Sequence, residues 1–558
     1  MTITHPRSTE LSIETSAATT VASHRRCTET IADTTVASHG GRQPTPFGPG
    51  NAIAELIRSR SAVYGHAPYL TAARGPGQVS FRHLEHRVSS LIAVLGDRGV
   101  VADATVGIAI TDPLEFAVHF LAIMASGRWV APLDPTSSPE AIATAVSRLE
   151  IALLVSDGGV SDGGPQSASD LHWADVGGDG RRHAPVAIDQ ALEEGTPSPA
   201  GMGGAILSSS GTTGAPKVIP VYQGRLLHTA RAVAAHHRLS PADRGFNPLP
   251  LFHINAEVVG LLATLVAGAN LVLDDRFHRT GFWALMEHHR VTWINAVPAI
   301  VSHLAGPDPD EAVPSRIRFI RSASAPLPAA TLSRFEANTG IPVLETYGMT
   351  EAASQITANP LVGARKPGSV GLPVGIELRI TADDISAPTT PGHVEIRGPS
   401  VITAYGGNCH RDRFAADGWL RTGDLGTVDA DGYLYLVGRT DDVINRGGEK
   451  VYPRDIEEAI LIDPDLMAAV VVAEDDAVLG QVPVAYLVLQ DSVDASDADT
   501  VEHVARRVGK HLDATLVRSQ RPVALHVVSQ LPAGATGKVQ RRALRHQRPP
   551  TLFSLSCR

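Results

Sequence analysis

The chain has 558 residues, of which 43% are hydrophobic and 19% are charged, and its 48 Lys and Arg against 58 Asp and Glu give a formal charge of -10. A chain of this length exceeds what one hydrophobic core usually supports, so two or more domains are expected. The acidic balance, without a basic stripe in the part expected to fold, argues against nucleic acid as a partner.

The cysteines Cys27, Cys409 and Cys557 are widely spaced and form no C-x-x-C pair. This pattern argues against a disulfide scaffold, a structural zinc site or secretion, and it fits the reducing cytoplasm, which is the expected location. No apolar run reaches the roughly 18 residues of a membrane span. Residues 1–45 hold little apolar material and no secretory h-region, so they are predicted to be a disordered leader.

Helix-like and strand-like stretches alternate after the leader, which predicts a parallel sheet and an α/β architecture. Ser80 stands where it can cap a helix. A Gly/Ser/Asp-rich stretch, residues 156–170, predicts an exposed loop. The predicted helices are 52–63, 81–99 and 115–127, and the predicted strands 105–110 and 129–134 lie before and after the third helix.

A stretch rich in serine, threonine and glycine, ILSSSGTTGAPKVIP, occupies residues 206–220. Gly211 and Gly214 can adopt backbone conformations that other residues rarely adopt. The hydroxyls and amides of the stretch can donate hydrogen bonds to phosphate oxygens, and Lys217 adds a positive charge. An ordinary surface loop has the same composition, so the residues alone leave both readings open. Two residues separate the second glycine from the lysine, which excludes the P-loop of nucleotide triphosphatases.

Residues 209–217 resemble the phosphate loop of the adenylate-forming superfamily, which comprises acyl-CoA synthetases, adenylation domains of non-ribosomal peptide synthetases and beetle luciferases. The resemblance implies that this loop binds the phosphates of ATP and that Lys217 takes part in catalysis. Val218 departs from the family, which usually has glycine there. The residues implied in phosphate binding are Ser209, Ser210, Gly211, Thr212, Thr213, Gly214 and Lys217.

A second match is ETYGMTEA, residues 345–352. Tyr347 offers a face for adenine, Thr350 a hydroxyl for the α-phosphate, and Glu351 a carboxylate for Mg²⁺, which prefers oxygen ligands. A helix capping box would place Thr and Glu three residues apart, whereas here they are adjacent. The nucleotide-binding residues implied at this motif are Glu345, Thr346, Tyr347, Gly348 and Thr350, with Glu351 as the metal ligand.

Three further stretches resemble parts of the family that surround the acyl group and adenine. His253, in PLFH, matches a histidine between the acyl pocket and the nucleotide, although a lone histidine is more often a core residue. The strand end at residues 295–298 matches the acyl pocket, with core packing as an equal alternative. The small-residue turn at residues 322–325 matches the turn beneath adenine, which assigns Ser324 and Ala325 to the cofactor, although a tight turn would have the same composition.

Beyond residue 366, alternation with a period of two predicts a small antiparallel barrel or sheet, with a hairpin turn at residues 429–432. The residues alone predict a turn at Asp424. The resemblance instead implies that Asp424 and Arg439 hold the ribose and that Asp441 is the hinge. It also implies that Gly447 and Gly448 face the pantetheine tunnel, although a simple hairpin turn explains them without the family.

A small α+β domain follows, and Lys538 lies near its end at the position of the family's catalytic lysine. The expected fold is therefore α/β, with a large N-terminal domain of α/β subdomains plus a small β-barrel, followed by a small mobile α+β domain. The expected boundaries are a leader at 1–45, an adenylation domain at 46–438, a hinge at 439–442, a lid domain at 443–546 and a tail at 547–558.

The motifs follow the family order and predict an ATP-dependent, AMP-forming acid:CoA ligase. Its expected cofactors are ATP and Mg²⁺, with coenzyme A as co-substrate and a small carboxylic acid as substrate. Two alternatives stay open: an adenylation enzyme that loads a carrier-protein phosphopantetheine, and a non-catalytic nucleotide-binding relative. The identity of the acid cannot be read from the sequence, because side chains from several segments shape such a pocket.

Overall fold

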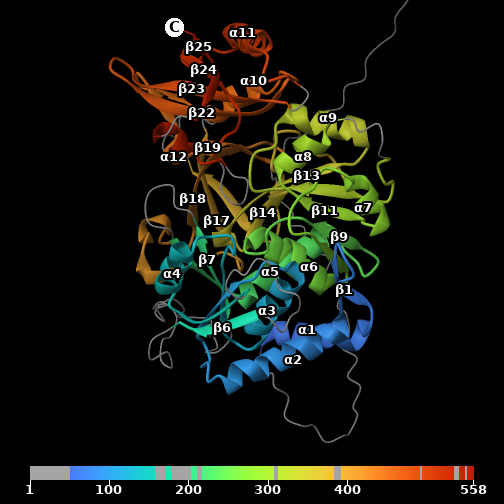
Figure 1. Cartoon of the computed structure of the whole chain (residues 1–558). Coiled ribbons are helices and arrows are strands. Elements are labelled where there is room, and N and C mark those ends of the chain that lie inside the picture. Colours follow the sequence, from blue (N-terminus) through green and yellow to red (C-terminus); the bar gives the residue numbers. More distant parts are fainter. Residues whose placement is uncertain are drawn as a thin grey trace, which may run out of the picture. The chain divides into compact units, whose positions relative to one another are not determined.

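A computed structural model describes residues 51–157, 171–176, 203–209, 217–306, 312–381, 391–490, 493–532, 539–546 and 549–557 (Figure 1). The predicted leader lies outside these residues, as does the predicted loop from residue 158 onward. Ser156 and Asp157, expected in that loop, instead end the strand β5 (Ile151–Asp157). Among the described helices, none has the length and hydropathy needed to cross a bilayer.

The first sheet has six strands in the order β6-β5-β3-β4-β7-β8. β3 pairs in parallel with β4 and β5, and β4 with β7, so the predicted parallel sheet is confirmed. The remaining bounds are β3 (Thr105–Ala109), β4 (Trp129–Pro132), β6 (Leu171–Asp175), β7 (Gly204–Ser209) and β8 (Lys217–Tyr222), with helices α3 (Pro113–Ala125) and α4 (Pro139–Arg148).

The second sheet has nine strands in the order β15-β14-β13-β12-β11-β9-β10-β1-β2. The six strands from β13 to β1 are parallel, and antiparallel strands close both edges. Ligands of such sheets bind beyond the carboxyl ends of the parallel strands. The strands are β1 (Pro68–Ala72), β2 (Gln78–Ser80), β9 (Arg244–Asn247), β10 (Asn270–Leu273), β11 (Trp293–Ala296), β12 (Phe319–Ser322), β13 (Val343–Met349), β14 (Ser354–Ala358) and β15 (Leu372–Pro373).

Helices pack on these sheets through apolar stripes. In α2 the Ser80 hydroxyl accepts a hydrogen bond from the His83 amide at 3.1 Å, as predicted, and the buried residues follow at spacings of three and four. Figure 1 shows α1 lying beside α2, which it contacts. The helices of this region are α1 (Ala52–Tyr64), α2 (Phe81–Asp97), α5 (Gln223–His236), the π-helix η3 (Asn255–Leu262), α6 (Ala263–Ala267), α7 (Phe282–His288), α8 (Pro298–Leu304) and α9 (Ala329–Thr339).

The period-two region forms an antiparallel sheet in the order β16-β17-β18-β19. Of the two predicted forms, barrel or sheet, the described strands adopt the open sheet, because β16 and β19 are its edges and do not pair with each other. The turn predicted at residues 429–432 joins β18 to β19, and the Asp429 amide donates to the Tyr433 carbonyl at 3.0 Å. The bounds are β16 (Glu377–Thr381), β17 (Gly392–Arg397), β18 (Leu420–Val428) and β19 (Leu434–Arg439).

The last part of the chain has its own sheet and its own apolar core, as the predicted α+β domain requires. One expectation is wrong: the tail at 547–558 is not separate, because β25 pairs antiparallel with β24 and contributes Phe553 and Leu555 to that core. The elements are β20 (Ile444–Arg446), β21 (Glu449–Val451), α10 (Pro453–Ile460), β22 (Leu466–Asp476), β23 (Gly480–Leu489), α11 (Ala498–Thr515), β24 (Ala524–Val528), α12 (Arg541–His546) and β25 (Thr551–Ser556).

Candidate active site

The hairpin between β13 and β14 carries the ETYGMTEA motif. A one-turn 3-10 helix, η4 (Thr350–Ala352), joins the strands, and Ala353 and Ser354 have positive φ angles of 51° and 96°. Gly348 makes the turn possible, because a Cβ atom there would lie 1.6 Å from the Ser354 carbonyl oxygen. This tight hairpin fixes Thr350 and Glu351 directly after the carboxyl end of β13.

Tyr347 and the strands β18 and β19 meet through Asp424. The Tyr347 hydroxyl donates to Asp424 Oδ2, and Arg439 Nη1 lies 3.2 Å from Asp424 Oδ1. Asp424 and Arg439 are cross-strand partners, so Asp424 is a strand residue and not the turn residue that the local pattern predicts. Burial, and then the negative charge of Asp424, raise the pKa of Tyr347 well above its usual range, which keeps the phenol protonated as a donor.

Glu351 lies at the centre of a second group, which includes two residues that the sequence did not single out, Tyr405 and Arg413. The Tyr405 hydroxyl donates to Glu351 Oε1 at 2.8 Å, and Arg413 Nη1 lies 3.0 Å from that hydroxyl and 3.6 Å from Glu351 Oε1. No motif marks Tyr405 or Arg413, because they lie 54 and 62 residues beyond Glu351, Tyr405 in an irregular segment and Arg413 in the one-turn 3-10 helix η6 (Arg411–Arg413).

Lys217 belongs to the same group. Its Nζ lies 5.1 Å from the centre of the Tyr405 ring, a cation–π distance. Burial lowers the pKa of Lys217, and the positive charge of Arg413 lowers it further, while Glu351 opposes both. The structure thus brings together one carboxylate and two cations, which suits a polyphosphate better than a lone metal ion.

The Glu351 carboxylate has an oxygen available for a Mg²⁺ ion. The Tyr405 hydroxyl occupies only Oε1 of Glu351, and no described residue donates a hydrogen bond to Oε2. Mg²⁺ commonly takes one or two protein carboxylates and fills its remaining positions with water and phosphate oxygens. Lys217 and Arg413 would repel a bare cation, so the residues fit Mg²⁺ that is carried by a nucleotide phosphate.

The other residues of the motif use their side chains differently. The Thr346 hydroxyl donates to the Ser322 carbonyl at 3.2 Å, so it joins β13 to β12. Glu345 is buried, and its Oε2 has no partner among the residues described. Burial raises the pKa of Glu345 to about 7, with Arg454 opposing the shift. The Thr350 side chain is half-buried and therefore still reachable.

The predicted turn beneath adenine is exposed and strained. Residues 324–326 are exposed after a fully buried strand, and Ser324 has a positive φ of 75°, which serine seldom adopts. The Asn255 side-chain amide donates to Ser324 Oγ at 3.4 Å. An open, strained turn at the carboxyl end of a parallel strand is typical of a ligand site.

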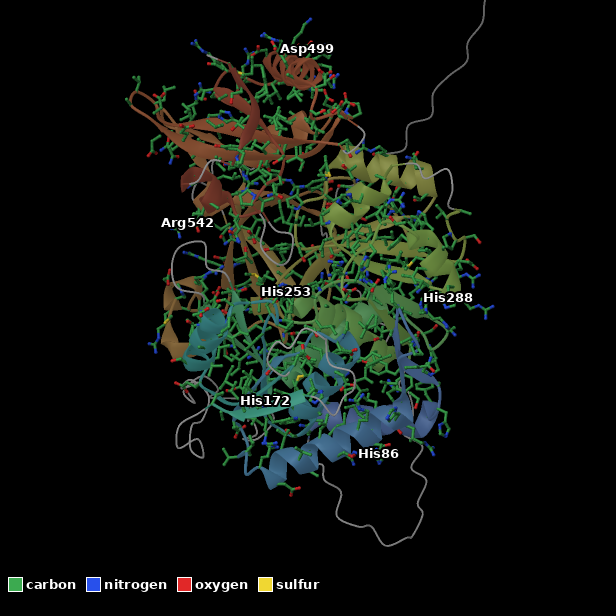
Figure 2. All side chains as sticks on the ribbon, in the orientation of Figure 1. His86, His172, His253, His288, Asp499 and Arg542 are labelled. Atoms are coloured by element: carbon green, nitrogen blue, oxygen red, sulfur yellow. The ribbon has the colours of Figure 1, made fainter. Side chains whose placement is uncertain are left out.

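His253 is half-buried, and Figure 2 shows it within the folded region, whereas the exposed His86 and His288 lie on surface helices. Burial lowers the pKa of His253 to about 4, with Asp134 opposing, and Nε2 is buried without a partner among the described residues. The alternative prediction was a core histidine whose ring nitrogens both have hydrogen-bond partners, and His253 does not have this arrangement among the described residues. A neutral imidazole can still bind a ligand by one hydrogen bond.

The residues at the strand end predicted to line the acyl pocket, 295–298, have two kinds of surroundings, apolar and polar. Ala296 and Pro298 are buried, and Ala296 belongs to an apolar cluster, as expected of core packing. Val297 is half-buried. Asn295 is fully buried but lies in a polar network, because its Nδ2 donates to Asn247 Oδ1 at 2.9 Å. Only Asn295 therefore offers polar chemistry at this strand end.

The predicted hinge and tunnel residues follow β19. Asp441 lies in an exposed 3-10 turn, η7 (Thr440–Asp442). Gly447 and Gly448 have φ angles of 62° and 95° and form the two-residue turn between β20 and β21, so the simple hairpin explains their conformation. Arg541 Nε lies 3.7 Å from Asp442 and thereby links α12 to this turn.

Part of the predicted site lies outside the described residues. This part comprises Lys538, which was the predicted catalytic lysine, and most of the phosphate loop. Of Ser209 only the strand position in β7 is known. The loop residues outside the description are Ser210, Gly211, Thr212, Thr213 and Gly214.

Comparisons with known proteins identify the family of the chain. Residues 57–406 match the AMP-binding enzyme family, and residues 455–538 match the AMP-binding enzyme C-terminal domain. The sulfoacetate–CoA ligase of Cupriavidus necator is 34% identical over 88% of this chain and 97% of that protein. The oxalate–CoA ligase of Arabidopsis thaliana is 33% identical over 82% of this chain and 90% of that protein.

Solved structures give the same result. The o-succinylbenzoate CoA synthetase of Bacillus subtilis, in complex with its acyl-adenylate intermediate, superposes with a TM-score of 0.72 at 25% identity, covering 88% of this chain and 98% of that one. The ATP-bound MatB of Rhodopseudomonas palustris superposes with a TM-score of 0.73 at 25% identity and the same coverage. The chain belongs to the AMP-binding enzyme family and is an AMP-forming acid:CoA ligase, as the order of its motifs predicts.

Proposed function

We propose that this chain activates a small carboxylic acid with ATP and transfers the acyl group to the thiol of free coenzyme A. The observation that carries the proposal is the pair of side-chain groups around the β13–β14 hairpin. One group joins Tyr347 to Asp424 and Arg439, and the other joins Glu351 to Tyr405, Arg413 and Lys217.

In the first half-reaction a carboxylate oxygen of the acid attacks the α-phosphorus of ATP. The bond between that phosphorus and the oxygen leading to the β-phosphate breaks, and pyrophosphate leaves. Tyr347 stacks on adenine, and Asp424 and Arg439 hold the ribose. Thr350, Lys217 and Lys538 stabilise the charge that develops on the phosphates, since positioning and electrostatics are the main terms in such chemistry. Mg²⁺ bound at Glu351 would supply further neutralisation of the phosphates.

In the second half-reaction the thiol of coenzyme A attacks the acyl carbon, and AMP leaves with the oxygen that joined it to the acyl group. The small domain turns about Asp441, which withdraws Lys538 and brings Gly447 and Gly448 toward the adenylate. Two exposed glycines without side chains suit the close passage of a narrow pantetheine arm. His253, neutral at physiological pH, lines the wall between the acyl group and the nucleotide.

Coenzyme A is favoured over a carrier protein because relatives that match nearly their full length are named as CoA ligases. Those relatives act on sulfoacetate and oxalate, which are short acids.

The two described cysteines, Cys409 and Cys557, are unpaired, which supports a cytoplasmic location.

The test is a panel of short, aryl and medium-chain acids incubated with ATP and Mg²⁺, with and without coenzyme A. We expect acid-dependent release of pyrophosphate and, only when coenzyme A is present, stoichiometric AMP and thioester. Pyrophosphate release without thioester would support a carrier-protein acceptor, and a phosphopantetheinylated carrier protein would then replace coenzyme A in the assay. The absence of pyrophosphate with every acid would refute the proposal.

A further inference from the structure

A buried arginine that forms no ion pair with any residue in the described part of the chain lies at the carboxyl end of β12. Arg321 is 1% exposed, and no carboxylate among the described residues lies within ion-pairing distance of it. Its hydrogen bonds go to three side-chain amides: Nε donates to Gln355 at 3.3 Å, and Nη1 donates to Asn255 at 2.7 Å and to Asn295 at 3.1 Å. No described residue accepts from Nη2, so that end of the guanidinium is free.

The charge of Arg321 is not neutralised by its surroundings. Burial lowers the pKa of Arg321 to about 9, which still leaves the side chain charged at neutral pH. After burial, the positive charge of Arg321 is among the causes that lower the pKa of His236 and of His237. Glu257 in η3 does not compensate it, because burial raises the pKa of Glu257 well above its usual range and both its oxygens lack partners in the described part of the chain.

An uncompensated buried charge is costly, and folded proteins generally pair such charges. Amides that turn their carbonyl oxygens toward the guanidinium make this burial tolerable but add no negative charge. The positive charge of Arg321 can therefore still be neutralised by an anionic group of a bound ligand. Arg321 suits that task, because its Nη2 still carries two N–H groups, and a guanidinium donates strong, charge-assisted hydrogen bonds to carboxylate and sulfonate oxygens.

The position of Arg321 connects it to the acid. Asn255, which accepts from Arg321, also donates to Ser324 in the exposed turn, so one amide side chain separates the guanidinium from the open edge of the sheet. Asn255 lies two residues after His253. Asn295, which also accepts a hydrogen bond from Arg321, is the polar residue of the strand end predicted to line the acyl pocket.

We propose that the acid activated by this chain carries a second anionic group, a carboxylate or a sulfonate, and that Arg321 binds that group while the reacting carboxylate faces the nucleotide. This inference rests on the proposed function and names its substrate class. Arg321 is then a specificity-determining residue, and the amides of Asn255, Asn295 and Gln355 orient it.

The experiment compares acids that differ only in the charge of the distal group. Malonate, succinate and sulfoacetate are paired with monomethyl malonate, monomethyl succinate and methylsulfonylacetate, and kcat/KM is measured from pyrophosphate release. For at least one pair we expect the wild-type chain to prefer the dianion by about 30-fold or more, the effect of losing one partner of a buried charge pair. The three pairs distinguish a carboxylate from a sulfonate.

Arg321→Gln should bring that preference close to one, mainly by lowering kcat/KM for the dianion, and Arg321→Lys should restore part of it. Arg318→Gln is the matched control: Arg318 lies just before the same strand, is partly exposed and pairs with Asp243 at 2.8 Å. It should leave the preference unchanged. If Arg321 had a purely structural role, Arg321→Gln would instead lower kcat/KM for both acids of a pair by the same factor.

The inference is overturned if the wild-type chain converts the neutral acids as well as the dianions, or if Arg321→Gln reduces both equally. Should that variant not fold, the wild-type preference decides alone. If the chain converts simple monoacids and none of the dianions, the inference is overturned and the proposed function stands. If no acid in a broad panel is converted, the proposed function fails and the inference falls with it.

Discussion

At the scale of single residues, Tyr347 joins the β13–β14 hairpin to the β16–β19 sheet through its hydroxyl. Tyr347→Phe keeps the ring that would stack on adenine but removes the donor to the buried Asp424 carboxylate. We expect the free energy of unfolding to fall by about 1.5 to 3 kcal/mol, the usual contribution of a hydrogen bond to a charged group.

Urea unfolding measures this loss, and acid-dependent pyrophosphate release should survive in Tyr347→Phe while Tyr347→Ala loses most of it. Tyr435→Phe is the control, because its hydroxyl makes only a long contact of 3.4 Å with Asp429 near the surface. An equal loss of activity in Tyr347→Phe and Tyr347→Ala would contradict the assignment of the ring to adenine.

Glu345 gives a pH dependence of stability. Burial raises its pKa from the usual 4.5 to about 7 in the folded chain, so between these values the folded state binds more protons than the unfolded one. The free energy of unfolding should therefore fall as the pH rises through this window, by roughly 3 kcal/mol in total from this group.

Glu345→Gln removes the titrating group, so the wild-type chain should lose stability relative to the variant between about pH 4.5 and 7. Above that window the two stability curves should run parallel, which serves as the internal control. Urea unfolding of both proteins at half-unit pH steps measures the difference. A difference that does not change with pH would refute the raised pKa of the buried Glu345 carboxyl.

At the scale of elements, the β13–β14 hairpin depends on one glycine. Gly348→Ala would place a methyl group 1.6 Å from the Ser354 carbonyl oxygen, so the two strands must separate. We expect a cost of more than about 2 kcal/mol in stability. Because the same turn positions Thr350 and Glu351, kcat should fall by about 100-fold, the effect of a displacement near 1 Å.

Gly96→Ala is the matched control. Gly96 lies in the last turn of α2, and a Cβ atom there meets no atom within 4 Å. Alanine should leave kcat unchanged and raise the free energy of unfolding by about 0.5 to 1 kcal/mol, the difference in helix propensity. If both variants behave alike in thermal unfolding and kcat, the hairpin does not have the tight turn described.

At the scale of the whole molecule, the proposed mechanism requires the last domain to serve two half-reactions in turn. Lys538 is proposed to act in the first only. Lys538→Ala should therefore abolish acid-dependent pyrophosphate release, while thioester formation from a supplied acyl-adenylate and coenzyme A continues at a comparable rate. Asp441→Pro, which stiffens the proposed hinge, should slow the second half-reaction more than the first. An equal loss of both half-reactions in Lys538→Ala would show that the alternation is wrongly assigned.

The sequence alone determined the class of fold, the order of its motifs and the activity. Hydrophobic periodicity reports which face of a helix or strand is buried, so the parallel sheet was predicted correctly. The Ser80 cap and the hairpin at residues 429–432 were predicted correctly because capping and turn residues act on their immediate neighbours. The motifs for nucleotide chemistry are short and local, so Tyr347, Glu351 and Lys217 could be singled out as candidate site residues from the sequence.

Only the tertiary structure decided which side chains meet. Tyr347 and Asp424 are 77 residues apart, and Tyr405 reaches Glu351 across 54, so no local pattern carries these pairings. In the sequence Arg321 resembles any polar residue at a strand end, and its proposed role follows from burial without an ion pair to any residue that the structure describes. The strand β25 was missed because its six residues gain their order from pairing with β24. Local periodicity is fixed by neighbouring residues, whereas burial and charge pairing depend on distant segments that only the folded chain brings together.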